Sequence, residues 1–162
     1  MMRGRESQES FGFLIRPYCG VAGVRFGMTP PAVAALLGPP LRCVRNYLGE
    51  RKDVWTGIKV CYDGATEGLI EIQLSRPSKA VYDGIDLLEV DDLVRTLLRH
   101  DPAPLESVGV ALFMKLGISI NVPAPGPTQS DPQRTLGIFA NGRWDRLLPR
   151  FGAYQTTASS NP

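Results

Sequence analysis

The sequence predicts an α+β protein in which two tandem repeats, each a helix followed by an antiparallel meander, form one domain. Three observations support this class. Residues 23–40 and 84–102 match without a gap, strand-like runs separated by polar turns follow both segments, and the composition is that of a globular chain. Of the 162 residues, 43% are hydrophobic and 21% are charged, which is enough apolar material for the core of one domain.

The evidence for a repeat is the match between "GVRFGMTPPAVAALLGPP" (23–40) and "GIDLLEVDDLVRTLLRHDP" (84–102). When Gly23 is placed on Gly84, apolar residues coincide along both segments. The coinciding pairs are Val24/Ile85, Phe26/Leu87, Ala32/Leu93, Val33/Val94, Leu36/Leu97 and Leu37/Leu98. This density of matches predicts that the two segments adopt the same local structure.

Both segments contain a short predicted helix. In the first, Thr29 is a good N-cap and Pro30 suits the first helical position, where its missing N–H is not needed. The run Gly38-Pro39-Pro40 then ends the helix. In the second segment we expect Asp91 to be the cap and Pro102 to end the helix. Because both helices are short, they require packing on another element to be stable.

That element is a predicted sheet. The strand-like runs after the first helix cover residues 41–48, 54–63 and 69–75. After the second helix, apolar residues alternate over 108–122, which predicts either two strands with a break near 115–117 or one long bent strand. Residues 135–140 close the second unit. We expect the two sheets to pack on, or continue into, one another, because about 60 residues alone form a marginal core.

The predicted organisation has four parts. An N-terminal segment (1–22) precedes the first unit (23–80), the second unit follows (81–150), and residues 151–162 form a disordered tail. Within the second unit, residues 123–134 are rich in Pro, Ser and Gly and predict a mobile loop. Loops of this length are either functional or simply disordered, and the sequence leaves both possibilities open.

Composition narrows the function classes. The formal net charge of +2 is too small to imply a nucleic-acid or membrane partner by itself. No apolar run approaches the ~20 residues of a membrane-spanning helix, and no signal-like segment is visible, so we expect a cytoplasmic chain without a membrane partner. Cys19, Cys43 and Cys61 lack the spacing of a disulfide framework or a zinc site. Each is expected to be a small buried apolar side chain.

No stretch of the sequence carries a specific catalytic motif. His100 is the only histidine, and it lies at the predicted end of the second helix, where a cation suits the helix dipole. Asp91 and Asp92 are adjacent in a helix start, so they do not face each other as an acid–base pair would. The glycine-rich "GVAGVRFG" lacks the spacing and the lysine of a phosphate-binding loop. We therefore predict no enzyme activity, no cofactor and no metal.

Binding through a surface is the remaining class of function, and several residues are candidate contacts. Trp55, Phe113 and Lys115 are out of phase with the apolar positions of their predicted strands, so we expect them to face away from the helix-covered side. Trp144 is a further candidate, although the spacing of the apolar residues after it is also that of a short packed helix.

An acidic segment supplies the other candidate contacts. These are Asp83, Asp86, Glu89, Asp91 and Asp92. If the partner were a nuclease with a basic cleft, these carboxylates would imitate phosphates; otherwise they form a solvated helix face. The basic residues are scattered over the N-terminal third: Arg16, Arg25, Arg42, Arg45, Arg51, Lys52 and Lys59, with Tyr47 and Trp55 nearby. Nucleic-acid binding is therefore ranked third among the binding hypotheses.

The segment "LIRPYCGVAGVRFGMTPPAVAALLGPP" resembles the Gly-x-x-Gly-Ile/Val-Arg-Phe-Gly-Met-Thr…Val…Leu-Gly-x-Pro opening of a family of small bacterial proteins. The resemblance continues through "GIKVCYDGATEGLIEIQLS", "YDGIDLL", "LGISINVP" and "LGIFANGRWD", so it covers nearly the whole chain. Members of this family look like immunity proteins of polymorphic-toxin systems. The resemblance implies a non-catalytic inhibitor that binds a cognate toxin C-terminal domain and occludes its active site.

The shorter "GMT…V…LG-P" element is also similar to that of small outer-membrane lipoproteins of the SmpA/OmlA type. It occurs too in beta-lactamase inhibitory proteins, which are tandem helix-plus-sheet repeats. The chain lacks the lipobox of the lipoproteins, so this second similarity bears on architecture alone. The alternative to an immunity protein is a small-molecule-binding or scaffolding module without a toxin partner.

Overall fold

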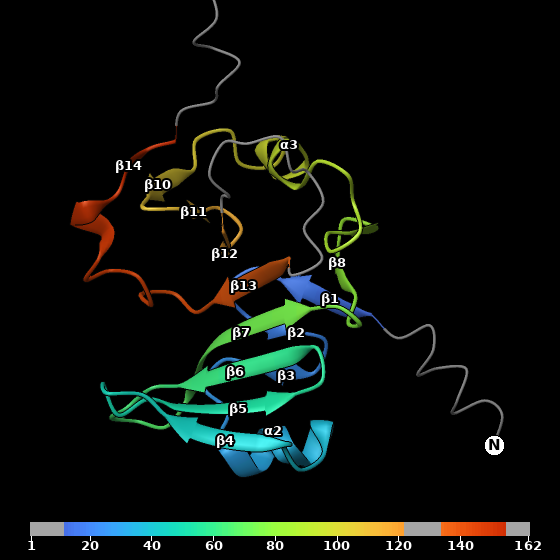
Figure 1. Cartoon of the computed structure of the whole chain (residues 1–162), viewed down its shortest axis with the longest axis vertical. Coiled ribbons are helices and arrows are strands. Elements are labelled where there is room, and N and C mark those ends of the chain that lie inside the picture. Colours follow the sequence, from blue (N-terminus) through green and yellow to red (C-terminus); the bar gives the residue numbers. More distant parts are fainter. Residues whose placement is uncertain (1–11, 122–133, 155–162) are drawn as a thin grey trace, which may run out of the picture.

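The computed structural model describes residues 12–121 and 134–154. Within them the chain forms two sheets and two short α-helices (Figure 1). A nine-stranded antiparallel sheet has the order β14-β10-β11-β12-β13-β7-β6-β5-β4, and a five-stranded mixed sheet has the order β3-β2-β1-β8-β9. The fold is therefore mostly β with helices added, in agreement with the predicted α+β class.

The nine-stranded sheet contains two meanders of four strands and a short last strand. Its strands are β4 (Arg42–Arg45), β5 (Arg51–Trp55), β6 (Ile58–Tyr62), β7 (Leu69–Ser75), β10 (Leu105–Ser107), β11 (Val110–Phe113), β12 (Ile118–Asn121), β13 (Thr135–Phe139) and β14 (Gly152–Ala153). The last strands of the two meanders, β7 and β13, pair antiparallel from Thr135↔Ser75 to Phe139↔Glu71. The two meanders thus continue into one sheet, which is one of the two arrangements expected from the sequence.

The five-stranded sheet was not foreseen in the sequence. Its strands are β1 (Phe13–Arg16), β2 (Gly20–Val21), β3 (Val24–Arg25), β8 (Ala80–Tyr82) and β9 (Ile85–Asp86). β1 pairs in parallel with β8, which brings the N-terminal segment beside the chain that leads to the second helix. The described part of segment 1–22 is therefore an integral part of the fold.

The two α-helices begin at polar caps. α2 (Pro30–Leu37) starts after Thr29, whose hydroxyl accepts a hydrogen bond from Ala32 N, and ends at Gly38. α3 (Leu93–Leu98) is capped by Asp92, whose carboxylate accepts from Arg95 N. The expectation that Asp91 is this cap is wrong by one residue. An N-cap side chain accepts a hydrogen bond from the N–H two or three residues later, and here the N–H of Arg95 bonds to Asp92. A 3-10 turn, η1 (Leu148–Arg150), follows β13.

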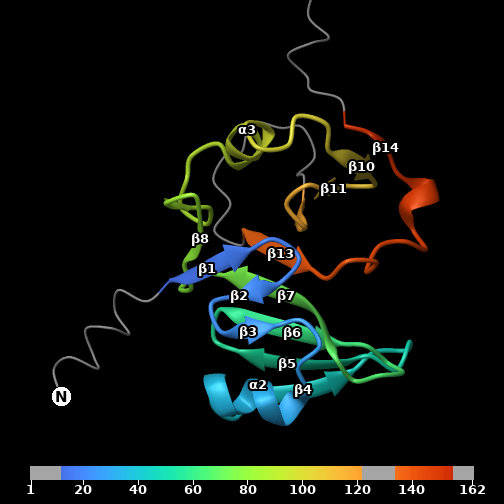
Figure 2. The ribbon, with the colours of Figure 1, turned by 180° about the vertical axis from the view of Figure 1, so that it is seen from behind.

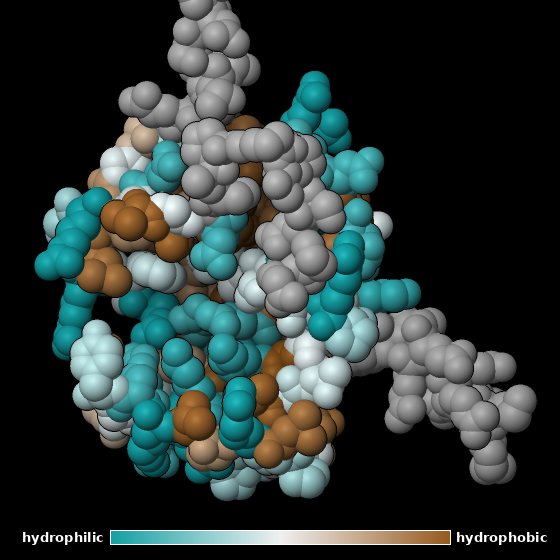
Figure 3. Space-filling model, in the orientation of Figure 1, coloured by the Kyte–Doolittle hydropathy of each residue, from teal (hydrophilic) through white to brown (hydrophobic). Residues whose placement is uncertain are grey.

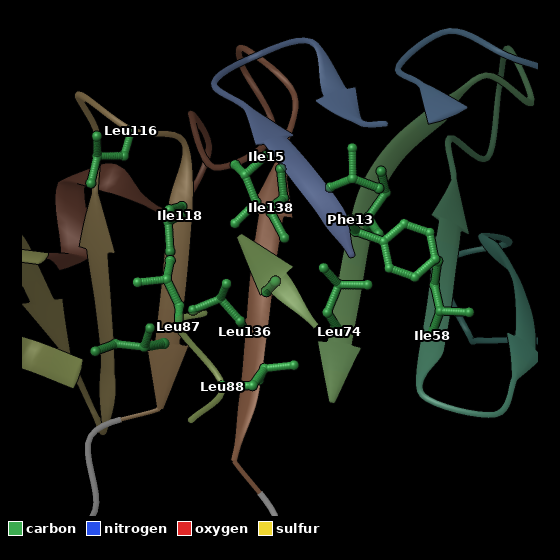
Figure 4. Packing of buried hydrophobic residues seen from close by; sticks show 14 of the residues in the cluster. Phe13, Ile15, Ile58, Leu74, Leu87, Leu88, Leu116, Ile118, Leu136 and Ile138 are labelled. Atoms are coloured by element: carbon green, nitrogen blue, oxygen red, sulfur yellow. The ribbon is translucent and has the colours of Figure 1, made fainter. Parts of the chain in front are cut away.

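The core lies between the two sheets. β1, β2, β3 and α2 lie over one face of strands β4–β7, and we call this covered face the inner face (Figure 2). In Figure 4, Phe13 and Ile15 of β1 point toward Ile58, Leu74 and Ile138 of the nine-stranded sheet. Each such side chain contributes about 1.5–3 kcal/mol by leaving water, so this contact holds the two sheets together.

Trp55 lies on the inner face, and the expectation that it faces away from the helix side is wrong. It pairs directly with Ile58, so both side chains point the same way. Its indole Nε1 donates to Gly38 O at 3.0 Å, at the end of α2. The run 54–63, predicted as one strand, is divided between two strands, because Thr56 and Gly57 form a two-residue turn. Alternation cannot be counted through such a turn.

Replacing Trp55 by phenylalanine is expected to lower the free energy of unfolding by about 1 kcal/mol, since the hydrogen bond to the α2 carbonyl is lost. Urea denaturation of the variant measures this change. Tyr47→Phe is the matched control, because Tyr47 is 93% exposed and its loss of a hydroxyl should change stability by less than about 0.5 kcal/mol. Equal effects of the two substitutions would contradict the role of Trp55 at the helix end.

The C-terminal residues 151–154 are part of the sheet, which contradicts their assignment to a disordered tail. β14 pairs with β10 through Leu105↔Ala153 and Glu106↔Gly152. Tyr154 N donates to Pro104 O at 3.0 Å, and its side chain packs against the core. The remaining tail, 155–162, and residues 123–133 of the predicted loop lie outside the described residues.

Candidate functional site

Most of the predicted acidic contacts support local structure. The Asp86 carboxylate accepts hydrogen bonds at 3.1 Å from Ala80 N and Leu88 N, which fixes the loop before α3. Asp92 caps α3. Glu89 forms an exposed ion pair with Arg76 at 2.7 Å. These three carboxylates are therefore already engaged within the chain.

Two members of the acidic segment, Asp83 and Asp91, are exposed and neither cap a helix nor pair with an arginine in the described residues. Asp83 lies 3.8 Å from His100 Nε2 and its side chain is 69% exposed, and Asp91 is exposed beside the α3 cap. His100 also contacts the Tyr82 ring edge to face. Among the described residues, no hydrogen bond links His100 to a cysteine. The acidic segment thus presents isolated carboxylates rather than one continuous acidic face.

The predicted aromatic contacts are also taken up by packing. Phe113 is 0% exposed and belongs to the core, so the expectation that it faces outward is wrong. It pairs with Ile118 across a turn at residues 114–117, and this turn resets the alternation of 108–122. Lys115 is exposed in that turn. Trp144 packs edge to face against Phe139 and Phe151. Packing within the chain is the alternative that the sequence left open for this residue.

The face of the nine-stranded sheet opposite the inner face, here called the outer face, is polar along β6 and β7. On β7, Ile72 and Leu74 are buried on the inner face, and Glu71 and Gln73 therefore point outward. On β6, Lys59 and Cys61 lie opposite Gln73 and Glu71. Figure 1 views this face of strands β4–β7 from the front.

An ion-pair network crosses the outer face. Arg143, after β13, donates from Nη1 to Glu50 Oε2 at 2.7 Å and from Nε to Glu71 Oε1 at 2.9 Å. The side chains are 21%, 13% and 9% exposed, respectively. Burial raises the pKa of Glu50, but hydrogen bonds from Arg143 and Asn46 outweigh it and hold this pKa below its ordinary value. The network joins the C-terminal segment to the β4–β5 turn and to β7.

Cys61 lies within this network, with its sulfur 3.8 Å from Arg143 Nη2 and 3.4 Å from Glu50 Oε1. Burial raises the pKa of its thiol to about 12. A thiol with such a pKa is almost fully protonated at neutral pH and is a poor nucleophile. Of the three cysteines, Cys61 is buried as expected, whereas Cys19 and Cys43 are exposed, contrary to expectation.

Three cations gather on the outer face, and we call this group the cationic stripe: Arg42 on β4, Lys52 on β5 and Lys59 on β6. Arg42 and Lys59 lie on either side of Val54, and Lys52 is the diagonal neighbour of both. Arg42 lies opposite Val54, and Val44 opposite Lys52. Diagonal neighbours of this kind lie about 7–8 Å apart. In the described parts of the chain, no ion pair involves any of the three. The stripe is a concentration of unneutralised positive charge.

Large apolar side chains are exposed around the stripe, and we call them the apolar rim. The rim comprises Leu41, Val44, Tyr47 and Leu48, which lie in β4 and the residues on either side of it. Leu41 is 74% exposed and Tyr47 is 93% exposed. Figure 3 shows hydrophobic residues set among hydrophilic ones at the lower end of the molecule, where α2 and β4 lie. Exposed apolar groups gathered in this way mark interaction sites on protein surfaces.

The outer face also has a hollow of about 100 Å³, lined by residues that include Glu71, Gln73, Ser119, Gly137 and Trp144. The Trp144 indole Nε1 is buried and has no hydrogen-bond partner among the described residues. A Cβ added to Gly137 would lie 2.2 Å from Ser119 Oγ, so the missing side chain leaves room for this hydroxyl. The hollow is small compared with the roughly 300–1,000 Å³ of most ligand pockets.

No cluster of three or more His, Cys, Asp or Glu side chains that could hold a metal ion occurs in residues 12–121 and 134–154. Neither of the described α-helices is long and apolar enough to cross a membrane. No protein-family model, no curated protein and no solved structure matches the chain. The geometry of the outer face is therefore the main guide to function.

Proposed function

We propose that the chain is a non-catalytic, cytoplasmic inhibitor of the immunity-protein type, which binds a cognate bacterial toxin domain and covers its active site. The observation that supports it most directly is the combination of the cationic stripe with the apolar rim. Exposed apolar groups mark interaction sites on protein surfaces, and charges beside them provide steering and specificity for a partner of opposite charge. The whole-chain resemblance to immunity proteins supports the same function, together with its division into two helix-plus-meander repeats within one domain.

The charge of the stripe indicates the chemistry of the partner. Three cations without ion-pair partners in the described chain favour a partner surface that carries carboxylates. We therefore propose Arg42, Lys52 and Lys59 as the main contact rather than the acidic segment. In that segment, Asp83 and Asp91 alone neither cap a helix nor support a loop nor pair with an arginine in the described residues. The proposed toxin face is acidic and partly apolar.

The competing functions find less support. The hollow of about 100 Å³ is too small for most metabolites, which weighs against a small-molecule-binding module. Single-stranded nucleic acid needs a series of aromatic platforms for its bases. Among the described residues, the apolar rim offers one exposed aromatic side chain, that of Tyr47, because Trp55 faces inward. One aromatic side chain is too few for such a series.

Charge reversal of the stripe tests the proposal. Tagged chain is used to capture partners from the native cell, and the C-terminal domain of a captured protein is then expressed in a second host. We expect this domain to arrest growth alone, and wild-type chain to restore growth and form a stoichiometric complex in size-exclusion chromatography. The double variant Lys52→Glu/Lys59→Glu should slow association at least tenfold at low salt, because steering by the stripe is reversed.

The matched control is Arg99→Glu/Lys115→Glu, which reverses two exposed charges at the other end of the molecule. This control should leave both capture and growth rescue unchanged. A captured domain that is not toxic would contradict the immunity function. Equal binding by the stripe variant and the control would remove the outer face from the interface. Binding of a single-stranded oligonucleotide in preference to any protein would overturn the proposal in favour of nucleic acid.

A further inference from the structure

β4 is the outermost strand of the nine-stranded sheet at the α2 end. All four of its residues are exposed, and no strand lies beyond it in the described residues. α2 lies beside this edge (Figures 1 and 2). An open edge strand is a template for pairing with another extended chain.

The register shows which backbone groups of β4 are open. Asn46 N donates to Glu50 O at 3.0 Å, at the turn end of the β4–β5 ladder. Hydrogen-bonded and non-hydrogen-bonded pairs alternate along an antiparallel ladder, so Val44 and Arg42 also direct their N–H and C=O groups toward β5. The N–H and C=O groups of Cys43 and Arg45 consequently point away from the sheet, toward the open edge.

The side chains of β4 limit what can pair there. Arg42 and Arg45 are both cationic, and the strand contains no carboxylate. Pairing with a second copy of β4 would bring four arginines into two adjacent strands, and like charges across a ladder are destabilising. A segment that alternates acidic and apolar residues would instead place all its carboxylates on the outer face, near Arg42 and the stripe. Arg45 points to the other face and already forms an ion pair with Glu67 at 3.7 Å. Leu41 and Tyr47, at the two ends of β4, would contact its apolar residues.

We propose that β4 binds an extended acidic segment of the partner as an added strand, by backbone hydrogen bonds to Cys43 and Arg45. This inference deepens the proposed function, because it names the way in which the toxin is held. Charged residues on an edge strand often only prevent aggregation. Here the exposed apolar rim flanks the charges and offers a contact that a purely protective edge would avoid.

The test uses a defined peptide of alternating Glu and Val, eight residues long and blocked at both ends. Binding is followed by amide hydrogen exchange in the whole chain. We expect exchange at Cys43 and Arg45 to slow by at least about tenfold at saturating peptide, as their N–H groups become hydrogen-bonded. Exchange at Arg42 and Val44, which already bond to β5, should change little.

Two control peptides separate strand addition from simple charge attraction. An alternating Lys-Val peptide has the wrong charge, and a Glu-Val peptide N-methylated at alternate residues keeps its charge but loses the backbone donors that face β4. Neither should protect Cys43 or Arg45. Equal binding by the N-methylated and unmodified peptides would overturn strand addition, and so would protection by a single-stranded oligonucleotide in place of the acidic peptide.

A backbone variant gives an independent measurement. Cys43→Pro removes the outward N–H without removing a β4–β5 bond, and proline is tolerated on edge strands when its N–H faces solvent. It should weaken binding of the Glu-Val peptide at least tenfold, whereas Cys43→Ser should bind as the wild type does. If Cys43→Pro does not fold, the peptide comparison decides alone. If it captures the toxin normally while the stripe variant does not, strand addition fails and the proposed function stands.

Discussion

Replacing Phe113 by alanine is expected to lower the free energy of unfolding by about 3–5 kcal/mol, the cost of emptying a phenylalanine site in a core. Phe113 is 0% exposed and pairs with Ile118 at the β11–β12 turn. Its ring therefore lies where the second meander meets the rest of the core. The measurement is guanidinium denaturation followed by circular dichroism.

The control for this variant is Lys115→Ala, two residues away and exposed in the same turn. Its effect on stability should stay within about 0.5 kcal/mol. A stable Phe113→Ala variant that fails to bind the toxin would restore Phe113 as a contact residue and contradict its place in the core. Loss of stability is the expected result, because removing a fully buried ring leaves a cavity.

The elements with strong local signals were predictable. Residues 69–75 alternate regularly and form β7 with the same bounds. The ends of α2 follow from Thr29, Pro30 and Gly38, because capping depends on the residues at the helix ends themselves. The break in 108–122 was one of two alternatives, and the turn at 114–117 confirms the two-strand version.

The failures at Trp55 and Phe113 have one cause. Both lie beside a tight turn, and the turn reverses the relation between position in the sequence and face of the sheet. Counting alternate residues through 54–63 or 108–122 therefore assigned both aromatic side chains to the wrong side. Strand phase has to be counted separately on each arm of a hairpin.

The five-stranded sheet could not be predicted for a different reason. β2, β3 and β9 contain two residues each, which is too short for any alternation to be visible. The parallel pair β1–β8 joins segments more than 60 residues apart, and pairing over that separation depends on the folded core. Similarly, the cationic stripe arises from the register of three strands, so Arg42, Lys52 and Lys59 look scattered in the sequence.

Replacing Arg143 by methionine is expected to lower the free energy of unfolding by about 2–4 kcal/mol at pH 7. Removing one partner of a largely buried ion pair leaves the opposite charge without compensation. Here two carboxylates, Glu50 and Glu71, would be left facing each other on the outer face. The C-terminal segment would also lose its link to β7. Arg146→Met is the control, because Arg146 is exposed and takes part in no ion pair of the described chain.

The dependence of this loss on pH distinguishes the network from simple packing. In the wild type the pKa of Glu50 is held below its ordinary value of 4.5. Its contribution is therefore complete above about pH 4.5 and is lost as the pH falls through the folded-state pKa. In Arg143→Met, the hydrogen bond and charge of Arg143 no longer oppose burial, so the pKa of Glu50 lies above its wild-type value and protonation relieves the variant as the pH falls. The difference in stability between wild type and variant should thus shrink from pH 7 to pH 4. A difference that stays constant over this range would show that Arg143 acts through its aliphatic stem, and the ion-pair account would be wrong.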